Sequence, residues 1–405
     1  MTRIALISDI HFGLFSRTAE FSVPGESIKD ENTGGESLKG SMISLLKNEN
    51  ITYLCIAGDL TSLGSPHEFV YCEKTILDIA KELDIPKRNI LVGLGNHDID
   101  WNISDLFSRF DKSNPDFPLD LVKEKYRKVA ASASLINLDS IVVPPKVGPA
   151  PFSGIIENDD FILFILNTGW CCTKEQAYNP GKLSKEQLEW FNKEAPNYKH
   201  SNKWKIILMH HHPFNYRYHI VCSDYSTLEE GSDFLDIAGK NGFHLVIHGH
   251  RHHPRAETNW KTGWDHPITF VCAGSFSVNA SHRSGGFIPN TLHIIELTDD
   301  IGVLKLCNYQ YSPAQGWIPF EANRPETPLD SVMMFGKLFD HDKINQAIQE
   351  LPDSVELKWD TLDECLRFMS FDDLNKRIKL HFDSTHNMIG KFPDSVFLLR
   401  KRGET

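Results

Sequence analysis

The stretch Gly95-Asn96-His97-Asp98 decides how the fold of this chain is interpreted. It follows the apolar run Ile90 to Leu94, which predicts a short buried strand. In open α/β sheets, ligands bind beyond the carboxyl ends of the parallel strands, so polar residues at such a place are candidates for chemistry. Asn96 offers a neutral oxygen ligand, and His97 offers an imidazole that can transfer a proton. A tight turn with a solvated histidine would explain these four residues alone equally well, so the rest of the chain has to decide.

Four other predicted strands also end in residues that can bind metal ions. These strand ends are Asp9 and His11, Gly58-Asp59, His210-His211-His212, and Gly249-His250-Arg251-His252. Because the carboxyl ends of parallel strands lie at one edge of a sheet, we expect these side chains to converge. Carboxylate, amide oxygen and imidazole without thiolate form a ligand set typical of Mn, Fe, Co or Zn. There are enough ligands for two such ions that share a bridging carboxylate.

A centre with two metal ions indicates a particular chemistry. It binds a phosphoryl group and lowers the pKa of a bridging water, so that hydroxide attacks phosphorus in line near neutral pH. The leaving alkoxide then needs a proton, and His97, oriented by Asp98, is the candidate donor. The sequence therefore predicts phosphoester hydrolysis.

Taken together, these residues resemble a known family. The five ordered motifs of the calcineurin-like metallophosphoesterases are matched by Asp9-Ile10-His11, Gly58-Asp59, Gly95-Asn96-His97-Asp98, His211-His212-Pro213 and Gly249-His250-Arg251-His252. The resemblance spans about residues 3 to 253 and implies an α/β fold, a two-sheet β-sandwich flanked by helices. Gly58-Asp59-Leu60-Thr61, with Gln187 and Trp190 on a later helix, is most similar to the subgroup of cyclic-nucleotide and glycerophosphodiester phosphodiesterases.

The resemblance also implies which residues bind each ion. One ion would have the ligands Asp9, His11, Asp59 and His252, and the other would have Asp59, Asn96, His211 and His250. We favour His211 because the family's ligand usually lies two residues before a proline, here Pro213. His210, directly after the strand, is the alternative. His97 and Asp98 would be the catalytic residues.

The chain divides into a metallophosphoesterase domain over residues 1–312 and a linker with a small, partly helical C-terminal appendage over 313–405. An insertion over about 101–138, helical near 121–131, is expected at the active-site mouth. Helices are also predicted after Pro66, after a capping box that begins at Ser184, and near 232–240. Strands near 268–272, 292–297 and 303–311 follow one another without helices, which predicts a mixed or antiparallel second layer. Pro325 and Pro328 indicate the linker.

Composition limits the class of protein. The formal net charge of −12 and pI of about 5.9 argue against a broad basic face for nucleic acid.

The chain enters its first strand at Ile4, so we expect no secretory signal, and no apolar run reaches the roughly 20 residues of a membrane span. Eight cysteines without a CxxC pair are typical of buried thiols in a reducing compartment. We therefore expect a soluble cytoplasmic protein.

The predicted activity is hydrolysis of a small phosphodiester, such as a cyclic nucleotide, by a metal-bridging hydroxide. A phosphomonoesterase, or a nuclease for single-stranded or short nucleic acid, is the alternative. Some basic and aromatic side chains would suit nucleic acid: Lys123, Lys125, Arg127, Lys128, Phe214, Tyr216, Tyr218 and Tyr225. A solvated helix face explains the basic residues as well, and loop packing explains the aromatic ones as well. A non-catalytic scaffold is disfavoured, because every motif retains a candidate ligand. The sequence identifies no protein partner for the C-terminal region.

Overall fold

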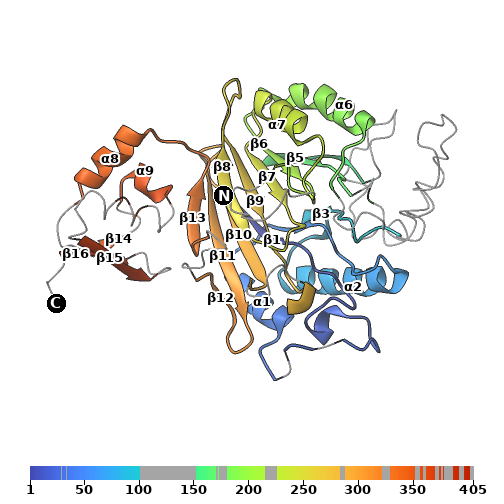
Figure 1. Cartoon of the computed structure of the whole chain (residues 1–405). Helices are drawn as coiled ribbons and strands as arrows, with labels where there is room; N and C mark the ends of the chain where they lie inside the picture. Colours follow the sequence, from blue (N-terminus) through green and yellow to red (C-terminus); the bar gives the residue numbers. More distant parts are fainter. Residues whose placement is uncertain are drawn as a thin grey trace.

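Two β-sheets lie face to face in the computed structural model of the chain, with helices on the outer side of each (Figure 1). Helices α1 (Leu38–Leu46) and α2 (Pro66–Glu82) cover the first sheet, and α6 (Lys185–Glu194) and α7 (Gly231–Lys240) cover the second. This arrangement confirms the predicted two-sheet α/β fold with flanking helices. The structure describes residues 1–28, 30–32, 34–100, 152–169, 172, 180–214, 226–282, 288–321, 329–351, 356–358, 362–369, 374, 377, 386–391 and 396–401.

The first sheet has the strand order β12-β11-β10-β1-β2-β3, and β13 also pairs with β11. Its strands are β1 (Thr2–Ile7), β2 (Tyr53–Ala57), β3 (Ile90–Gly93), β10 (Thr291–Leu297), β11 (Leu304–Ser312), β12 (Gly316–Pro319) and β13 (Val332–Phe335). The three N-terminal strands are parallel to one another, whereas β10 runs antiparallel to β1. The carboxyl ends of β1, β2 and β3 therefore lie at one edge.

The second sheet has the order β4-β5-β6-β7-β9-β8. Its strands are β4 (Gly154–Glu157), β5 (Phe161–Ile165), β6 (Trp204–Leu208), β7 (Leu245–His248), β8 (Arg255–Asn259) and β9 (Ile268–Cys272). The four inner strands are parallel, and the two edge strands are antiparallel to their neighbours. Both sheets are thus mixed.

The inner strands of the second sheet have helices on one face and the first sheet on the other, so they are buried on both faces. On β6, Ile206 and Leu208 join the core between the two sheets, whereas Ile207 and the following Met209 join the core beneath α6 and α7. Successive side chains of a strand point to opposite faces, so one strand supplies both cores. This double burial explains why β5, β6 and β7 are nearly continuous apolar runs in the sequence.

The helices begin where their capping residues predict. Ser65 and Glu68 form a complete capping box at the start of α2, and Pro66 occupies the first helical position. Ser184 caps α6 by accepting a hydrogen bond from the backbone N–H of Gln187. The reciprocal half of that predicted box does not form, because the Gln187 side chain donates to Ser153 Oγ at 2.8 Å instead.

Two expectations about the later strands need correction. The strands near 292–297 and 303–311 do run antiparallel, but they extend the first sheet beside β1 and do not build a second layer. The strand at 268–272 is parallel to β7 in the second sheet. The predicted boundary at 312 falls inside the first sheet, because β12 and β13 both pair with β11. The division into two domains itself stays a prediction.

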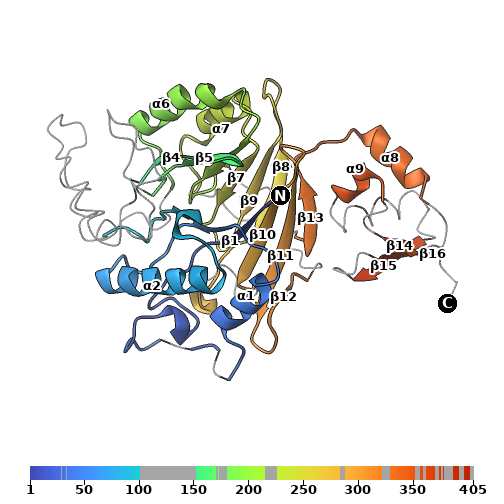
Figure 2. The same ribbon diagram turned by 180° about the vertical axis from the view of Figure 1, so that it is seen from behind.

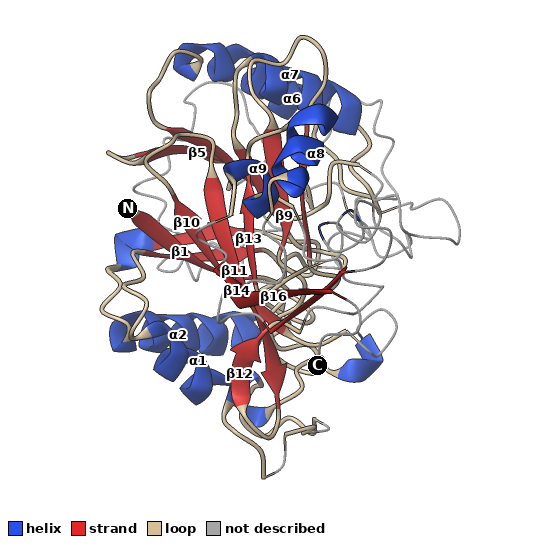
Figure 3. Ribbon diagram, turned by 90° about the vertical axis from the view of Figure 1, so that its left-hand side faces the viewer, coloured by secondary structure: helices blue, strands red, loops and turns tan. Residues whose placement is uncertain are grey.

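Beyond β13, the described part of the chain contains helices and a small sheet, which lie beside β13 in Figures 1 and 2. Helices α8 (His341–Gln349) and α9 (Glu364–Arg367) pack through a small apolar cluster that includes Ile348 and Leu366. Strands β14 (Glu356–Lys358), β15 (His386–Lys391) and β16 (Val396–Lys401) form a sheet of their own. Figure 3 shows α8 and α9 in front of the sheets and β14 and β16 in front of β11.

Several predicted features lie outside the described residues. They are the insertion at 101–138 with its helix, the basic residues Lys123, Lys125, Arg127 and Lys128, the aromatic residues Tyr216, Tyr218 and Tyr225, and the linker residues Pro325 and Pro328. Short 3-10 helices are η1 (Ala19–Phe21), η2 (Lys87–Asn89), η3 (Ala195–Tyr198) and η4 (Ala280–His282). Among the helices of the described residues, none combines the length and the apolar character needed to cross a membrane.

Candidate metal centre

The loops that follow β1 and β2, and the loops that follow β6 and β7, are joined through their backbones. Asp9 N–H donates to the Gly58 carbonyl at 3.0 Å, and His11 N–H donates to the Asp59 carbonyl at 2.9 Å. Gly249 N–H donates to the carbonyl of His210 at 3.0 Å, which joins the ends of β6 and β7. Strand ends within each sheet are thereby joined, and polar side chains from both sheets converge beside them.

The backbone in these loops adopts conformations that non-glycine residues rarely adopt. Of the eight non-glycine residues with positive φ in the described ranges, five are predicted metal ligands: Asp9, His11, Asp59, His250 and His252, with φ between 47° and 75°. Such conformations cost roughly 1 to 3 kcal/mol each and concentrate at functional sites. The alternative of an ordinary turn with a solvated histidine does not account for this concentration.

Two motif glycines allow the close approach of these loops. Gly58 has φ +95°, and a Cβ at that position would collide with the His210 ring. A Cβ on Gly249 would collide with Ser8 Oγ and lie 2.5 Å from Asp9 Oδ2. The glycines before Asp59 and His250 are therefore required by packing against the ligands of other loops.

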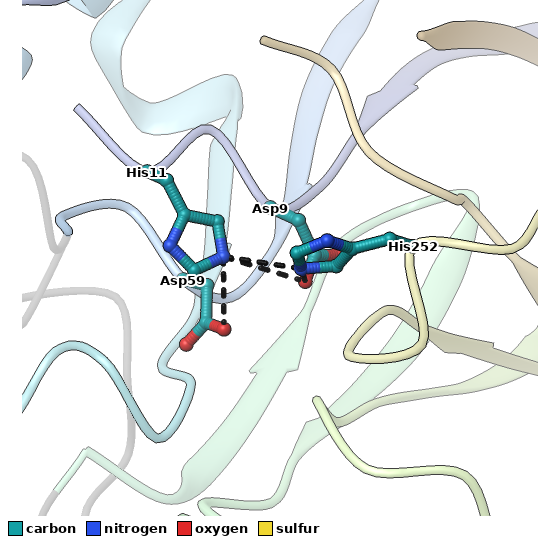
Figure 4. Close-up of side chains that lie close together, drawn as sticks. All are labelled: Asp9, His11, Asp59 and His252. Carbon is teal, nitrogen blue, oxygen red and sulfur yellow. Dashed lines mark hydrogen bonds and ion pairs between the residues drawn. The ribbon is translucent and has the colours of Figure 1, made fainter. Parts of the chain in front are cut away.

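Four side chains form a first cluster, shown in Figure 4. His252 Nε2 lies 3.2 Å from Asp9 Oδ1 and 3.2 Å from His11 Nε2. His11 Nε2 in turn lies 3.4 Å from Asp59 Oδ2 and 4.0 Å from Asp9 Oδ1. These are the four residues predicted for one ion, so the structure brings the whole set together.

A second cluster shares the Asp59 carboxylate. His210 Nε2 lies 3.1 Å from Asp59 Oδ2, the same oxygen that faces His11. His250 belongs to this cluster, and its Nδ1 lies 3.0 Å from Asn96 Oδ1. Asp59 therefore lies between two groups of ligand atoms, in the position of a bridging carboxylate.

The spacing of these atoms fits metal ions. Ligands about 2.1 Å from an ion, at angles between octahedral and tetrahedral, lie about 3.0 to 3.4 Å from one another. Most of the distances above fall in that range. His210 Nε2 is buried and has no hydrogen-bond partner, although it points at Asp59 within ion-pair distance. A buried nitrogen without a hydrogen-bond partner, aimed at a carboxylate oxygen, is the arrangement expected of two ligands to one cation.

Backbone carbonyls orient three histidines. His210 Nδ1 lies 2.8 Å from the Ala57 carbonyl, His252 Nδ1 3.1 Å from the His282 carbonyl, and His97 Nδ1 2.7 Å from the Ser62 carbonyl. A carbonyl oxygen can only accept, so each Nδ1 donates and each Nε2 is left to bind a metal ion or a reacting group. These partners are backbone atoms, and for that reason no residue pattern predicted them.

Hydrogen-bond donors orient the carboxylates of Asp9 and Asp59. Ser8 Oγ donates to Asp9 Oδ2 at 2.6 Å, and His250 N–H donates to both Asp9 oxygens at 3.1 and 3.2 Å. The backbone N–H of His97 donates to Asp59 Oδ1 at 2.8 Å, which leaves Asp59 Oδ2 for the ligand position. Ser8 was missed in the sequence, where its only signal is its place directly before Asp9.

Electrostatics keep most ligands in their binding form. Burial, reinforced by His97, lowers the pKa of His11 to about 4, and burial beside His211 lowers the pKa of His250 well below its usual value. Burial would raise the pKa of Asp59, but His210 and His97 hold it well below the usual range. Burial opposes a charge on His210, yet Asp59 raises the His210 pKa to about 9. A proton and a metal ion would compete for His210 Nε2, so metal binding there would release a proton.

The structure favours His210 over His211 as the ligand from the histidine triple. His211 Nδ1 lies 2.8 Å from Thr168 Oγ1, and its Nε2 lies 3.9 Å from Cys172 Sγ. Its ring packs against the ring of His250, with the centroids 4.2 Å apart. We therefore propose His210 in place of the preference based on Pro213, because His210 faces Ala57 and Gly58 of the other sheet and His211 faces Thr168.

Asp98 and His97 differ in how they are placed. Asp98 is fully buried, and its carboxylate accepts hydrogen bonds from Gly95 N–H at 2.9 Å and Thr61 N–H at 3.0 Å. Burial and the charge of Asp59 raise the Asp98 pKa to about 7. Asp98 thus fixes the loop and orients His97 through the backbone. The His97 ring is only partly buried and lies 4.5 Å from the His11 ring, centroid to centroid, beside the first cluster.

The other singled-out residues lie elsewhere. Phe214 packs edge-on against Phe270, with centroids 4.8 Å apart, within the core beneath α6 and α7. Gln187 and Trp190 are buried on α6. The last residue of β7, His248, is also fully buried, and burial together with His212 lowers its pKa to about 3. Cys55, Cys72, Cys172, Cys272 and Cys365 are buried free thiols, and Cys307 is half-buried.

A two-sheet sandwich whose strand ends hold two ligand clusters around one shared carboxylate defines a dimetal phosphoesterase. The sequence model of the family described as calcineurin-like phosphoesterase matches residues 2–254, well over half of the chain. The chain belongs to this calcineurin-like phosphoesterase family, whose members bind two transition-metal ions, and it is a phosphoester hydrolase by family.

Solved structures with a similar fold share little sequence with this chain. A dimetal phosphatase from Danio rerio is 12% identical, with 76% of this chain and 95% of that chain covered and a TM-score of 0.43. A purple acid phosphatase from yellow lupin is 13% identical, with 76% and 51% covered and a TM-score of 0.45. Vps29 from Chaetomium thermophilum is 11% identical, with 84% and 97% covered and a TM-score of 0.34. No curated protein shows significant similarity to the sequence.

The shared carboxylate generates a first prediction. Asp59→Asn should lower the metal content from about two ions per chain to less than one, because an amide is a much weaker bridging ligand. Metal content is measured by plasma mass spectrometry after loading with Mn. Asp84→Asn is a matched control, since Asp84 also has positive φ but lies on an exposed turn. Unchanged metal content in Asp59→Asn would contradict the bridging assignment.

The choice within the histidine triple generates a second prediction. His210→Gln should remove about one ion and weaken Mn binding by tenfold or more, because it replaces a direct ligand. His211→Gln should retain both ions, since His211 Nδ1 lies 2.8 Å from Thr168 Oγ1 and its Nε2 lies 3.9 Å from Cys172 Sγ. Titration calorimetry with Mn, with melting temperatures in chelator as a check on folding, separates the two. A greater loss of metal in His211→Gln would restore the assignment based on Pro213.

Proposed function

We propose that this protein hydrolyses a small phosphodiester, with a cyclic nucleotide as one example, at the site formed by the two clusters. The observation that carries the proposal is the placement of Asp59 Oδ2 between His11 and His210, with His97 beside the first cluster. Two ions bound there supply a nucleophilic hydroxide near neutral pH and neutralise charge on the phosphoryl group. Mn, Fe, Zn and Co all suit the ligand set.

Different residues of the chain would bind the metal ions and donate the proton. Asp9, His11, Asp59 and His252 would hold one ion, and Asp59, Asn96, His210 and His250 would hold the other. His97 donates a proton to the leaving alkoxide as the bond between phosphorus and that oxygen breaks. Its Nδ1 is committed to the Ser62 carbonyl, so Nε2 is the nitrogen that transfers the proton.

The choice of a diester rests on a stretch beside the site. Thr61 belongs to the Gly58-Asp59-Leu60-Thr61 stretch that resembles the phosphodiesterase subgroup, and it donates hydrogen bonds to the loop that carries His97. Its N–H donates to Asp98, and its Oγ1 donates to the His97 carbonyl at 3.0 Å. This contact links the stretch on which the resemblance to the subgroup rests to the loop of the proposed proton donor.

A substrate panel tests the proposed function. Purified, Mn-loaded protein is assayed with bis-p-nitrophenyl phosphate, p-nitrophenyl phosphate, a cyclic nucleotide, and single- and double-stranded DNA. We expect turnover of the diesters and its loss in chelator. Faster turnover of p-nitrophenyl phosphate would favour a phosphomonoesterase, and preferred cleavage of DNA would favour a nuclease. No turnover of any substrate by protein with two bound ions would favour the scaffold interpretation.

The role of His97 gives a further prediction. His97→Ala should slow hydrolysis of a dialkyl phosphodiester by about 10² to 10⁴ fold, because the alkoxide leaves unprotonated, and should slow an aryl diester far less. Rates on the two esters are compared at equal metal content. His67→Ala, at an exposed position on α2, is the control. Equal losses on both esters would argue against His97 as the proton donor.

A further inference from the structure

Two aromatic side chains form a stacked pair at the edge of the candidate site. The rings of Phe15 and His282 lie 4.2 Å apart, centroid to centroid, with an angle of 25° between their planes. They come from separate loops, one after the Asp9-Ile10-His11 motif and the other at the end of η4 (Ala280–His282). We call this pair the aromatic platform.

The backbone beneath the aromatic platform is firmly held. Phe15 N–H donates to Ser62 Oγ at 3.1 Å, and the Phe15 carbonyl accepts from Asn279 N–H at 2.9 Å. The neighbouring Ser16 forms a β-bridge with Val278, which joins the two loops. His282 Nδ1 lies 2.8 Å from Asn279 Oδ1. The platform is thus preorganised, which reduces the entropy lost when a ligand stacks on it.

The aromatic platform borders both the proposed proton donor and the first metal cluster. The Phe15 ring lies 5.9 Å from the His97 ring and 5.9 Å from the His11 ring, centroid to centroid. The His282 carbonyl accepts the hydrogen bond from Nδ1 of the ligand His252. A group that leaves toward His97 would therefore meet Phe15 and His282 next.

The aromatic platform is accessible to solvent, and exposed leucines lie next in sequence to Phe15 and to Ser62. His282 is exposed and Phe15 is half-buried, whereas Asp9, His11 and Asp59 are almost completely buried. Leu14 and Leu63 are 42% and 46% exposed, and both are among the few large apolar side chains exposed in the described residues. Leu14 precedes Phe15, and Leu63 follows Ser62, whose carbonyl binds His97.

We infer that the aromatic platform binds a flat aromatic ring on the leaving alcohol of the substrate, as in a nucleoside. This inference rests on the proposed function, because His97 defines the side from which the alcohol leaves. A planar ring gains from stacking on an exposed aromatic ring such as His282, whereas a glycerol-like alcohol has no aromatic face to stack. The substrate class is therefore a phosphoester of an aromatic or nucleoside alcohol.

Two substrates with alkyl leaving groups test the inference. One is the dinucleoside monophosphate of deoxyadenosine, and the other is diglyceryl phosphate, which lacks a ring. The ratio of their kcat/KM values should favour the dinucleoside in the wild type and fall by about tenfold in Phe15→Leu and in His282→Ala, mainly through KM. Trp260→Leu, an exposed aromatic position after β8, is the matched control. An unchanged ratio in both variants, at unchanged metal content, would overturn the inference.

A binding measurement separates the platform from the proposed activity. Saturation-transfer NMR should show weak binding of deoxyadenosine to the wild type and its loss in both variants. His282→Ala keeps the carbonyl that orients His252, so loss of binding there does not reflect damage to the ligand set. Deoxyadenosine binding without turnover of either diester would retain the platform and overturn the phosphodiesterase proposal. Diester turnover without deoxyadenosine binding would retain the activity and overturn the platform.

Discussion

The placement of one buried carboxylate determines the arrangement of the site. Asp59 is 1% exposed, its Oδ1 accepts the backbone N–H of His97, and its Oδ2 faces His11 from one loop and His210 from another. A carboxylate buried in this way is costly unless positive charge compensates it. Gly58 brings the loop close to His210, and the parallel strands of both sheets bring the other ligands to the same place. Changes to any of these supports would therefore act on the site through Asp59.

The sequence predicted most of the inner strands and helices, because periodicity and capping are local signals. Strand β3 matches the apolar run Ile90 to Leu94 within a residue, and helix α2 begins at Pro66. Some edge strands were not predicted. One is β8, whose segment Arg255–Asn259 is mostly polar and has no apolar run. Sheet membership could not be predicted either, because the pairing of β10 with β1 depends on contacts between residues nearly 290 positions apart, which no local pattern records.

The ligand types could be predicted from the strand ends, but the choice among adjacent histidines could not. All three residues of the triple follow β6 directly, so their chemistry is the same. What distinguishes them is the alternation of the strand: Ile206 and Leu208 face the other sheet, and His210 continues that face two residues further on. His211 continues the face of Ile207 and Met209, toward Thr168. The alternation is visible in the sequence, but which face looks toward the metal centre is known only once the two sheets are placed. The proline spacing carried no information about the face.

The strained backbone conformations at the site are tolerated because burial of the inner strands stabilises the rest of the fold. Five ligand residues with positive φ cost together roughly as much as the whole net stability of a typical domain. The inner strands offset this cost, since each is packed on both faces, one against the other sheet and one against helices. Relaxing a single loop would also break backbone hydrogen bonds to its neighbours, such as that from His11 N–H to the Asp59 carbonyl. The strained conformations are therefore maintained cooperatively, and the ligand atoms are held at metal-binding distances by the two sheets and not by the loops alone.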